Sequence, residues 1–165
     1  MTTSEGLASR SLDVPGARLH YEVRGAGPLL LVIGSPMAAA EFRPLAHAMA
    51  ADHTVVTYDP RGYAASSIDD PQQDSTPDLR AHDVAAILDD LGADTADVFG
   101  SSGGAVTGLA LVTEHPGRVR TLIAHEPPLL ELLPDVEAQR AATEAIIATF
   151  HRDGADAAWM AFMAN

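Results

Sequence analysis

Short runs of strand-forming residues alternate along this chain with segments of helical periodicity. The predicted strands cover residues 17–23, 29–33, 54–58, 96–99 and 120–124. Between them, apolar residues recur at helical spacing in segments 41–51, 77–91 and 105–114. Parallel neighbouring strands need a crossover connection, which a helix usually supplies. The alternation therefore predicts an α/β fold, a mostly parallel sheet flanked by helices.

The helix predicted before strand 96–99 has clear boundaries. Thr76 offers a side-chain oxygen as N-cap, and Pro77 follows where its missing N–H does no harm. Gly92 is placed as the residue that ends the helix. After Pro127 and Pro128 the pattern changes to Ala-rich helical segments. We therefore expect a core over residues 1–126 and a helical region over residues 127–165.

Composition excludes several classes of function. With 47% hydrophobic and 20% charged residues the chain is typical of globular proteins. A net charge of −13 disfavours binding to nucleic acid or to anionic membranes. The absence of cysteine excludes thiolate ligands and thiol nucleophiles, and it fits a cytoplasmic location, since no secretory signal or membrane segment is visible. No group of His and carboxylate residues has metal-ligand spacing, so no metal or cofactor is predicted.

A Gly-x-Ser-x-Gly sequence, Gly100-Ser101-Ser102-Gly103-Gly104, joins a predicted strand to a predicted helix. In such a turn the serine has a strained backbone that lifts its hydroxyl clear of the sheet. The residues two before and two after it must be very small, because strand and helix nearly touch. Ser102 meets this condition, whereas Ser101 would need Phe99 at a crowded position. Ser102 is therefore the predicted nucleophile.

Four segments together resemble the N-terminal part of the α/β-hydrolase family. Residues 98–106 (VFGSSGGAV) resemble its nucleophile turn, and residues 29–37 (LLLVIGSPM) resemble the strand and loop that usually read His-Gly-x-Pro. Residues 59–66 (DPRGYAAS) are similar to its Asp-x-Arg-Gly-x-Gly-x-Ser turn, and residues 115–119 (HPGRV) to the loop before its sixth strand. The resemblance implies the α/β-hydrolase fold, truncated after the sixth strand and the start of the helical cap.

The resemblance also implies a mechanism. Ser102 would attack an acyl carbonyl, and the backbone N–H groups of Ser35 and Gly103 would form the oxyanion hole. Because aspartate nucleophiles mark the family's epoxide hydrolases and dehalogenases, a serine indicates an ester, lactone or related acyl substrate. Ile33 stands where the family usually has His, and Ala64 replaces a usual glycine.

A serine nucleophile needs a base that a carboxylate orients. In the family both lie on strands beyond the sixth, so we expect this chain to be a fragment that is inactive alone. Glu126, after strand 120–124, is a candidate triad acid, and His125 is a weaker candidate base. The competing reading for both is a junction between core and cap.

Two expectations concern partners. Apolar residues in 127–165 predict a lid over an apolar small-molecule acyl substrate, although ordinary helix packing explains them equally well. Strand 120–124 would lack a neighbour on one side, so the chain should self-associate or pair with a second chain. An alternative function is a non-catalytic binding or regulatory module that keeps the fold.

Overall fold

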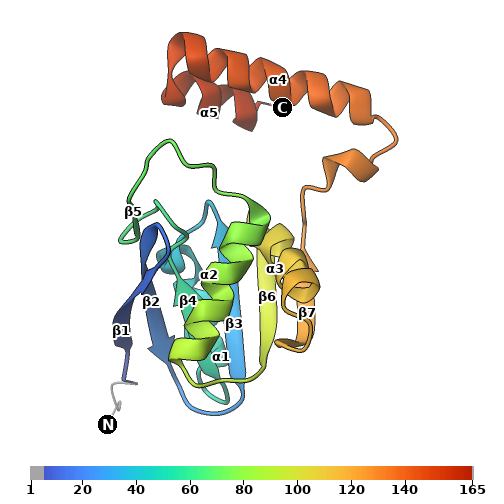
Figure 1. The fold of residues 1–165 in the computed structure, drawn as a ribbon. Coiled ribbons are helices and arrows are strands. Elements are labelled where there is room, and N and C mark those ends of the chain that lie inside the picture. Colours follow the sequence, from blue (N-terminus) through green and yellow to red (C-terminus); the bar gives the residue numbers. More distant parts are fainter. Residues whose placement is uncertain (1–5, 165) are drawn as a thin grey trace. The chain divides into compact units, whose positions relative to one another are not determined.

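The computed structural model describes residues 6–164 (Figure 1). They divide into two compact units, and the boundary in the sequence lies between Pro128 and Leu129. The first unit contains a sheet and three helices. Its strands are β1 (Ala8–Val14), β2 (Ala17–Arg24), β3 (Leu29–Ser35), β4 (Thr54–Tyr58), β5 (Ser67–Ile68), β6 (Ala96–Ser102) and β7 (Val119–His125). Its helices are α1 (Arg43–Met49), which follows a short 3₁₀ turn (Ala39–Phe42), α2 (Pro77–Asp90) and α3 (Gly103–Glu114).

The strands lie in the order β1-β2-β4-β3-β6-β7, and β5 pairs with β2 outside this path. Pairs β4–β3, β3–β6 and β6–β7 are parallel, whereas β2 is antiparallel to each of its partners. The sheet and its flanking helices confirm the predicted α/β fold. The carboxyl ends of β4, β3, β6 and β7 share one edge, where open α/β sheets place their ligands.

Strand β3 explains how the sheet is covered on both faces. Leu31 and Ile33 are fully buried in a cluster with residues of α2 and α3, while Val32 is buried on the opposite face with Ala46 of α1. Figure 1 shows α2 and α3 on one side of the sheet and α1 on the other. Burying each such aliphatic side chain contributes about 1.5–3 kcal/mol. The continuous apolar run of β3 is thus what a strand covered on both sides requires.

Helix α2 has the predicted boundaries. The Thr76 hydroxyl oxygen accepts a hydrogen bond from the Leu79 N–H at 3.2 Å. Pro77 is the first helical residue, and Gly92 adopts a positive φ of 65° beyond the end of the helix. The helix therefore begins and ends where its local sequence specifies.

Two strands were not predicted from the sequence. β1 is an edge strand that pairs only with β2, and most of its side chains are exposed. An exposed edge strand needs few apolar residues, so ASRSLDV carries little period-two signal. β5 is only two residues long.

The second unit is a pair of helices, α4 (Val136–Asp153) and α5 (Ala155–Met163), preceded by a 3₁₀ turn (Leu130–Leu132). Gly154 joins them with a φ of 89°. Phe150, Trp159 and Phe162 are each more than half exposed. No helix in residues 6–164 is long and apolar enough to cross a membrane.

Candidate active site

Ser102 lies at the junction of β6 and α3 with φ 55° and ψ −125°. This backbone conformation is unfavourable for a residue with a Cβ and costs about 1–3 kcal/mol. Ser101, one residue earlier, is an ordinary member of the strand. The side chain of Ser102 is partly exposed at the carboxyl end of the sheet. The strained residue is thus the serine that the motif singles out.

The flanking glycines allow this turn to form. A Cβ on Gly100 would lie 2.6 Å from the Gly104 carbonyl oxygen, and one on Gly104 would lie 2.3 Å from the Ile33 carbonyl oxygen. Both distances are far below any van der Waals contact, so neither position admits a larger residue without backbone movement. The close approach of β3, β6 and α3 is the physical content of the Gly-x-Ser-x-Gly pattern.

Ser35 ends β3 beside this turn. It is the register partner of Ser102, and a Cβ on Gly103 would lie 2.8 Å from the Ser35 carbonyl oxygen. Gly103 begins α3, so its N–H belongs to the first helical turn, where backbone donors lack helical acceptors. The structure therefore brings the two predicted oxyanion-hole residues together next to Ser102.

Arg80 of α2 reaches the same place, which the sequence did not predict. Its Nη1 donates a hydrogen bond to the Ser35 hydroxyl oxygen at 3.3 Å, and its Nε is buried without a hydrogen-bond partner. The positive charge of Arg80 also interacts with the buried Asp83 carboxylate of the same helix. The sequence held a signal, because Arg80 and the buried Asp83 are charged residues on the helix face of Val84 and Ile87.

The turn at residues 59–66 supports the loop after β3. The Asp59 carboxylate accepts hydrogen bonds from the Ala39 N–H at 2.9 Å and the Ala65 N–H at 3.1 Å. It thereby joins this turn to the segment that leads into α1. Ala64, which replaces a usual glycine, has a positive φ of 48°.

Ile33 departs from the expected histidine and is completely buried in the core. Apolar packing of Ile33 therefore fixes the end of β3 that leads to Ser35. The adjacent Ser35–Pro36 peptide bond is cis.

A complete triad does not lie within residues 6–164. The Ser102 hydroxyl makes no hydrogen bond to any residue in that range. The Nδ1 of His125 lies 3.3 Å from the Ser101 hydroxyl oxygen, so this imidazole contacts the neighbouring serine. Glu126 is exposed, has a φ of 50°, and its carboxylate lies 3.9 Å from His125 Nδ1.

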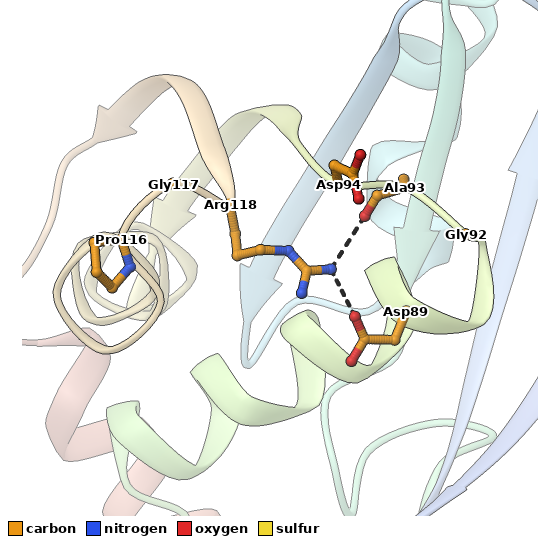
Figure 2. Close-up of a pocket in the computed structure, with 7 residues that line it drawn as sticks. All are labelled: Asp89, Gly92, Ala93, Asp94, Pro116, Gly117 and Arg118. Atoms are coloured by element: carbon orange, nitrogen blue, oxygen red, sulfur yellow. Dashed lines mark hydrogen bonds and ion pairs between the residues drawn. The ribbon is translucent and has the colours of Figure 1, made fainter.

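A pocket of about 430 Å³ lies at the other end of the sheet (Figure 2). Its lining residues precede β6 and β7: Asp89, Gly92, Ala93, Asp94, Pro116, Gly117 and Arg118. Arg118 forms an ion pair with Asp89 at 2.8 Å and donates a hydrogen bond to the Ala93 carbonyl oxygen. This arrangement ties two loops together at the amino ends of the strands, remote from Ser102.

The fold agrees with comparisons with known proteins. Residues 27–154 match the α/β-hydrolase fold family, and the chain belongs to that family. It is 40% identical over 142 residues to the uncharacterized hydrolase YraK of Bacillus subtilis, a match that covers 86% of this chain and 51% of YraK. It is 34% identical over 128 residues to the zearalenone hydrolase of Cladophialophora bantiana, covering 75% of this chain and 48% of that enzyme.

Solved structures show the same likeness. A proposed epoxide hydrolase from Pseudomonas aeruginosa superposes with a TM-score of 0.73 and 27% identity, covering 89% of this chain and 52% of that protein. The chain therefore spans about half the length of the relatives it matches. Both curated relatives are named as hydrolases.

Proposed function

We propose that the protein containing this chain is a serine hydrolase that acts on an ester, a lactone or a related acyl substrate. The observation that carries the proposal is the strained backbone of Ser102 at the junction of β6 and α3. Strain of this size is kept where the surrounding structure enforces it, and it is typical of functional residues. A serine in this place favours acyl transfer over epoxide opening, for which the family uses aspartate.

In the proposed mechanism, the Ser102 hydroxyl attacks the acyl carbonyl carbon while a base accepts its proton. The backbone N–H groups of Ser35 and Gly103 donate to the oxygen that becomes negative. Removing one such donor typically costs about 3 kcal/mol of transition-state stabilisation. The guanidinium of Arg80 lies beside Ser35 and adds a favourable potential for that oxygen.

The proposed mechanism also needs a base and a carboxylate that orients it. Glu126 stands at the carboxyl end of β7, on the edge of the sheet that carries Ser102, and remains our candidate for the acid. α4 and α5 expose apolar side chains, which supports a role as part of a lid for an apolar acyl group. Within the described residues the outer edge of β7 is unpaired, which supports self-association or pairing with another segment.

Fluorophosphonate labelling of the full-length protein tests this function. Peptide mass spectrometry should find the label on Ser102, and Ser102→Ala should remove it. Ser101→Ala is the matched control, because it deletes the neighbouring hydroxyl and keeps the turn. Absence of label at Ser102, with the folded state intact, would favour a non-catalytic binding module instead.

A further inference from the structure

A second serine of this protein lies at the end of a series of hydrogen-bonded Ser, His and Asp side chains, far from Ser102. The Ser9 hydroxyl oxygen lies 2.8 Å from His20 Nε2, and His20 Nδ1 lies 3.1 Å from the Asp59 carboxylate. Ser9 belongs to β1, His20 to β2, and Asp59 directly follows β4. Ser9 and His20 lie on the two strands of one hairpin, and the pairing of β2 with β4 adds Asp59, which is 39 residues from His20.

The carboxylate and the imidazole are held firmly. Asp59 is almost fully buried, and backbone N–H groups of Ala39 and Ala65 donate to its two oxygens. The side chain of His20 is 22% exposed, and its backbone N–H donates to the Ser66 hydroxyl at 2.8 Å. Nδ1 facing a fixed carboxylate selects the tautomer in which Nε2 is a free acceptor, directed at Ser9.

This connectivity is that of an activated nucleophile. A serine hydroxyl within hydrogen-bond reach of an imidazole, which a carboxylate orients in turn, is the general signature of serine acyl transfer. We propose that Ser9 is a second nucleophilic serine, which accepts acyl or phosphonyl groups from small activated esters and organophosphonates.

The proposed step balances as follows. A bond forms between Ser9 Oγ and the carbonyl carbon of an aryl ester, and the bond from that carbon to the aryloxide oxygen breaks. The hydroxyl proton passes to His20 Nε2 and from there to the departing aryloxide. Attack of water by the same route then returns free Ser9 and releases the carboxylic acid.

The surroundings of Ser9 define which substrates fit. Ala8, Ser9 and Arg10 are all exposed on the edge strand, so no enclosure selects among acyl groups. In an edge strand alternate backbone N–H groups face solvent, so either Ser9 or Arg10 offers one beside the hydroxyl. A single solvent-exposed donor is a weak oxyanion hole, which restricts the reaction to esters with good leaving groups.

Ser9 and Ser102 are independent sites. β1 and β6 are separated by β2, β4 and β3, which places them on the order of 20 Å apart at about 4.8 Å per strand. The proposal for Ser9 therefore does not depend on the proposed function of Ser102. It also means that a fluorophosphonate can label two serines of one molecule.

The test is peptide-resolved labelling of the full-length protein with a fluorophosphonate and with p-nitrophenyl acetate, in a Ser102→Ala background. Ser11 is the internal control, because it is an exposed serine on the same strand, opposite His20 in the register. General-base assistance is worth about 10²–10⁴ in rate. We therefore expect Ser9 to be modified at least about 100-fold faster than Ser11, and His20→Asn to remove that advantage.

Equal rates at Ser9 and Ser11 would overturn the proposal, and this comparison needs no substitution at the chain Ser9-His20-Asp59. An unchanged Ser9 rate in folded His20→Asn would overturn it as well. If the protein with Ser102 intact is labelled at Ser9 and not at Ser102, the proposed function of Ser102 is wrong and the proposal for Ser9 stands.

Discussion

Arg61 and Asp83 form a two-point ion pair that is almost completely shielded from water. Arg61 Nε and Nη2 donate to the two Asp83 oxygens at 2.8 and 2.6 Å, and the side chains are 3% and 2% exposed. Arg61 belongs to the turn that follows β4, and Asp83 lies on α2. The pair therefore ties the helix that carries Arg80 to the turn that supports the loop of Ser35.

Removing one partner of this pair should destabilise the protein strongly. Arg61→Met leaves a buried carboxylate without its partner, which costs about 3–5 kcal/mol. Arg61→Met combined with Asp83→Leu should cost less than Arg61→Met alone, because no unpaired charge remains. Urea unfolding of the three proteins measures both effects. A double variant less stable than the single one would contradict this account.

Gly104→Ala should disrupt the contact between β3 and α3. Its Cβ would lie 2.3 Å from a backbone oxygen that cannot move without shifting the strand, so we expect a loss of about 2–3 kcal/mol. Gly108→Ala in the same helix is the control. Its Cβ meets the end of the flexible Leu122 side chain, and alanine favours the helix by about 1 kcal/mol. Thermal or urea unfolding should therefore show a much smaller change for Gly108→Ala.

Ser102→Gly should stabilise the fold while it removes the proposed nucleophile. Glycine adopts a φ of 55° without the strain of a side chain, which is worth about 1–3 kcal/mol. The extra conformational freedom of glycine in the unfolded chain favours unfolding and cancels about 0.5–1 kcal/mol of that gain. The expected net change is about 1 kcal/mol in favour of folding. Ser102→Ala keeps the strain, so its unfolding free energy should match the unsubstituted protein.

Arg80→Met should lower turnover by about tenfold in the full-length protein, because it removes a charge beside the proposed oxyanion hole. Arg80→Lys keeps the charge and should retain most of the activity. Steady-state kinetics with an aryl ester would measure both. A higher KM with unchanged kcat would show that Arg80 acts in substrate binding rather than on the transition state.

Acid should weaken the link between β6 and β7. Hydrogen bonds from Arg120 hold the pKa of Asp97 below its ordinary value of 3.8. A carboxylate with a depressed folded-state pKa stabilises the fold above its unfolded value, and that stabilisation disappears as pH falls through the folded value. The effect is small, since both side chains are partly exposed. Urea midpoints of Asp97→Asn should therefore approach those of the unsubstituted protein as pH falls from 6 to about 3.

Local sequence predicted the parts of the fold that local forces determine. The apolar run of β3, the capped helix α2 and the Gly-x-Ser-x-Gly turn were all recognised, because each carries its own pattern. β1 escaped prediction because its residues are largely exposed, and an edge strand is defined by its partner rather than by its composition.

In the candidate site, too, some features could be predicted from the sequence and others could not. The positions of Ser35, Ser102 and Gly103 follow from strand ends and a helix start, which sequence patterns locate. The hydrogen bond from Arg80 to Ser35 and the chain from Ser9 through His20 to Asp59 depend on which elements become neighbours in the sheet. Periodicity within one segment contains no information on such neighbours.

β3 lies at the centre of the sheet with a parallel partner on each side. Substitutions beside this strand and substitutions in the outer strands are therefore limited to different degrees. The backbone beside Ser102 is packed between three adjoining segments and tolerates almost no change of residue size. The outer strands carry no such constraint. Descendants of this chain could therefore diversify along the rim of the sheet while the alignment at its centre is inherited unchanged.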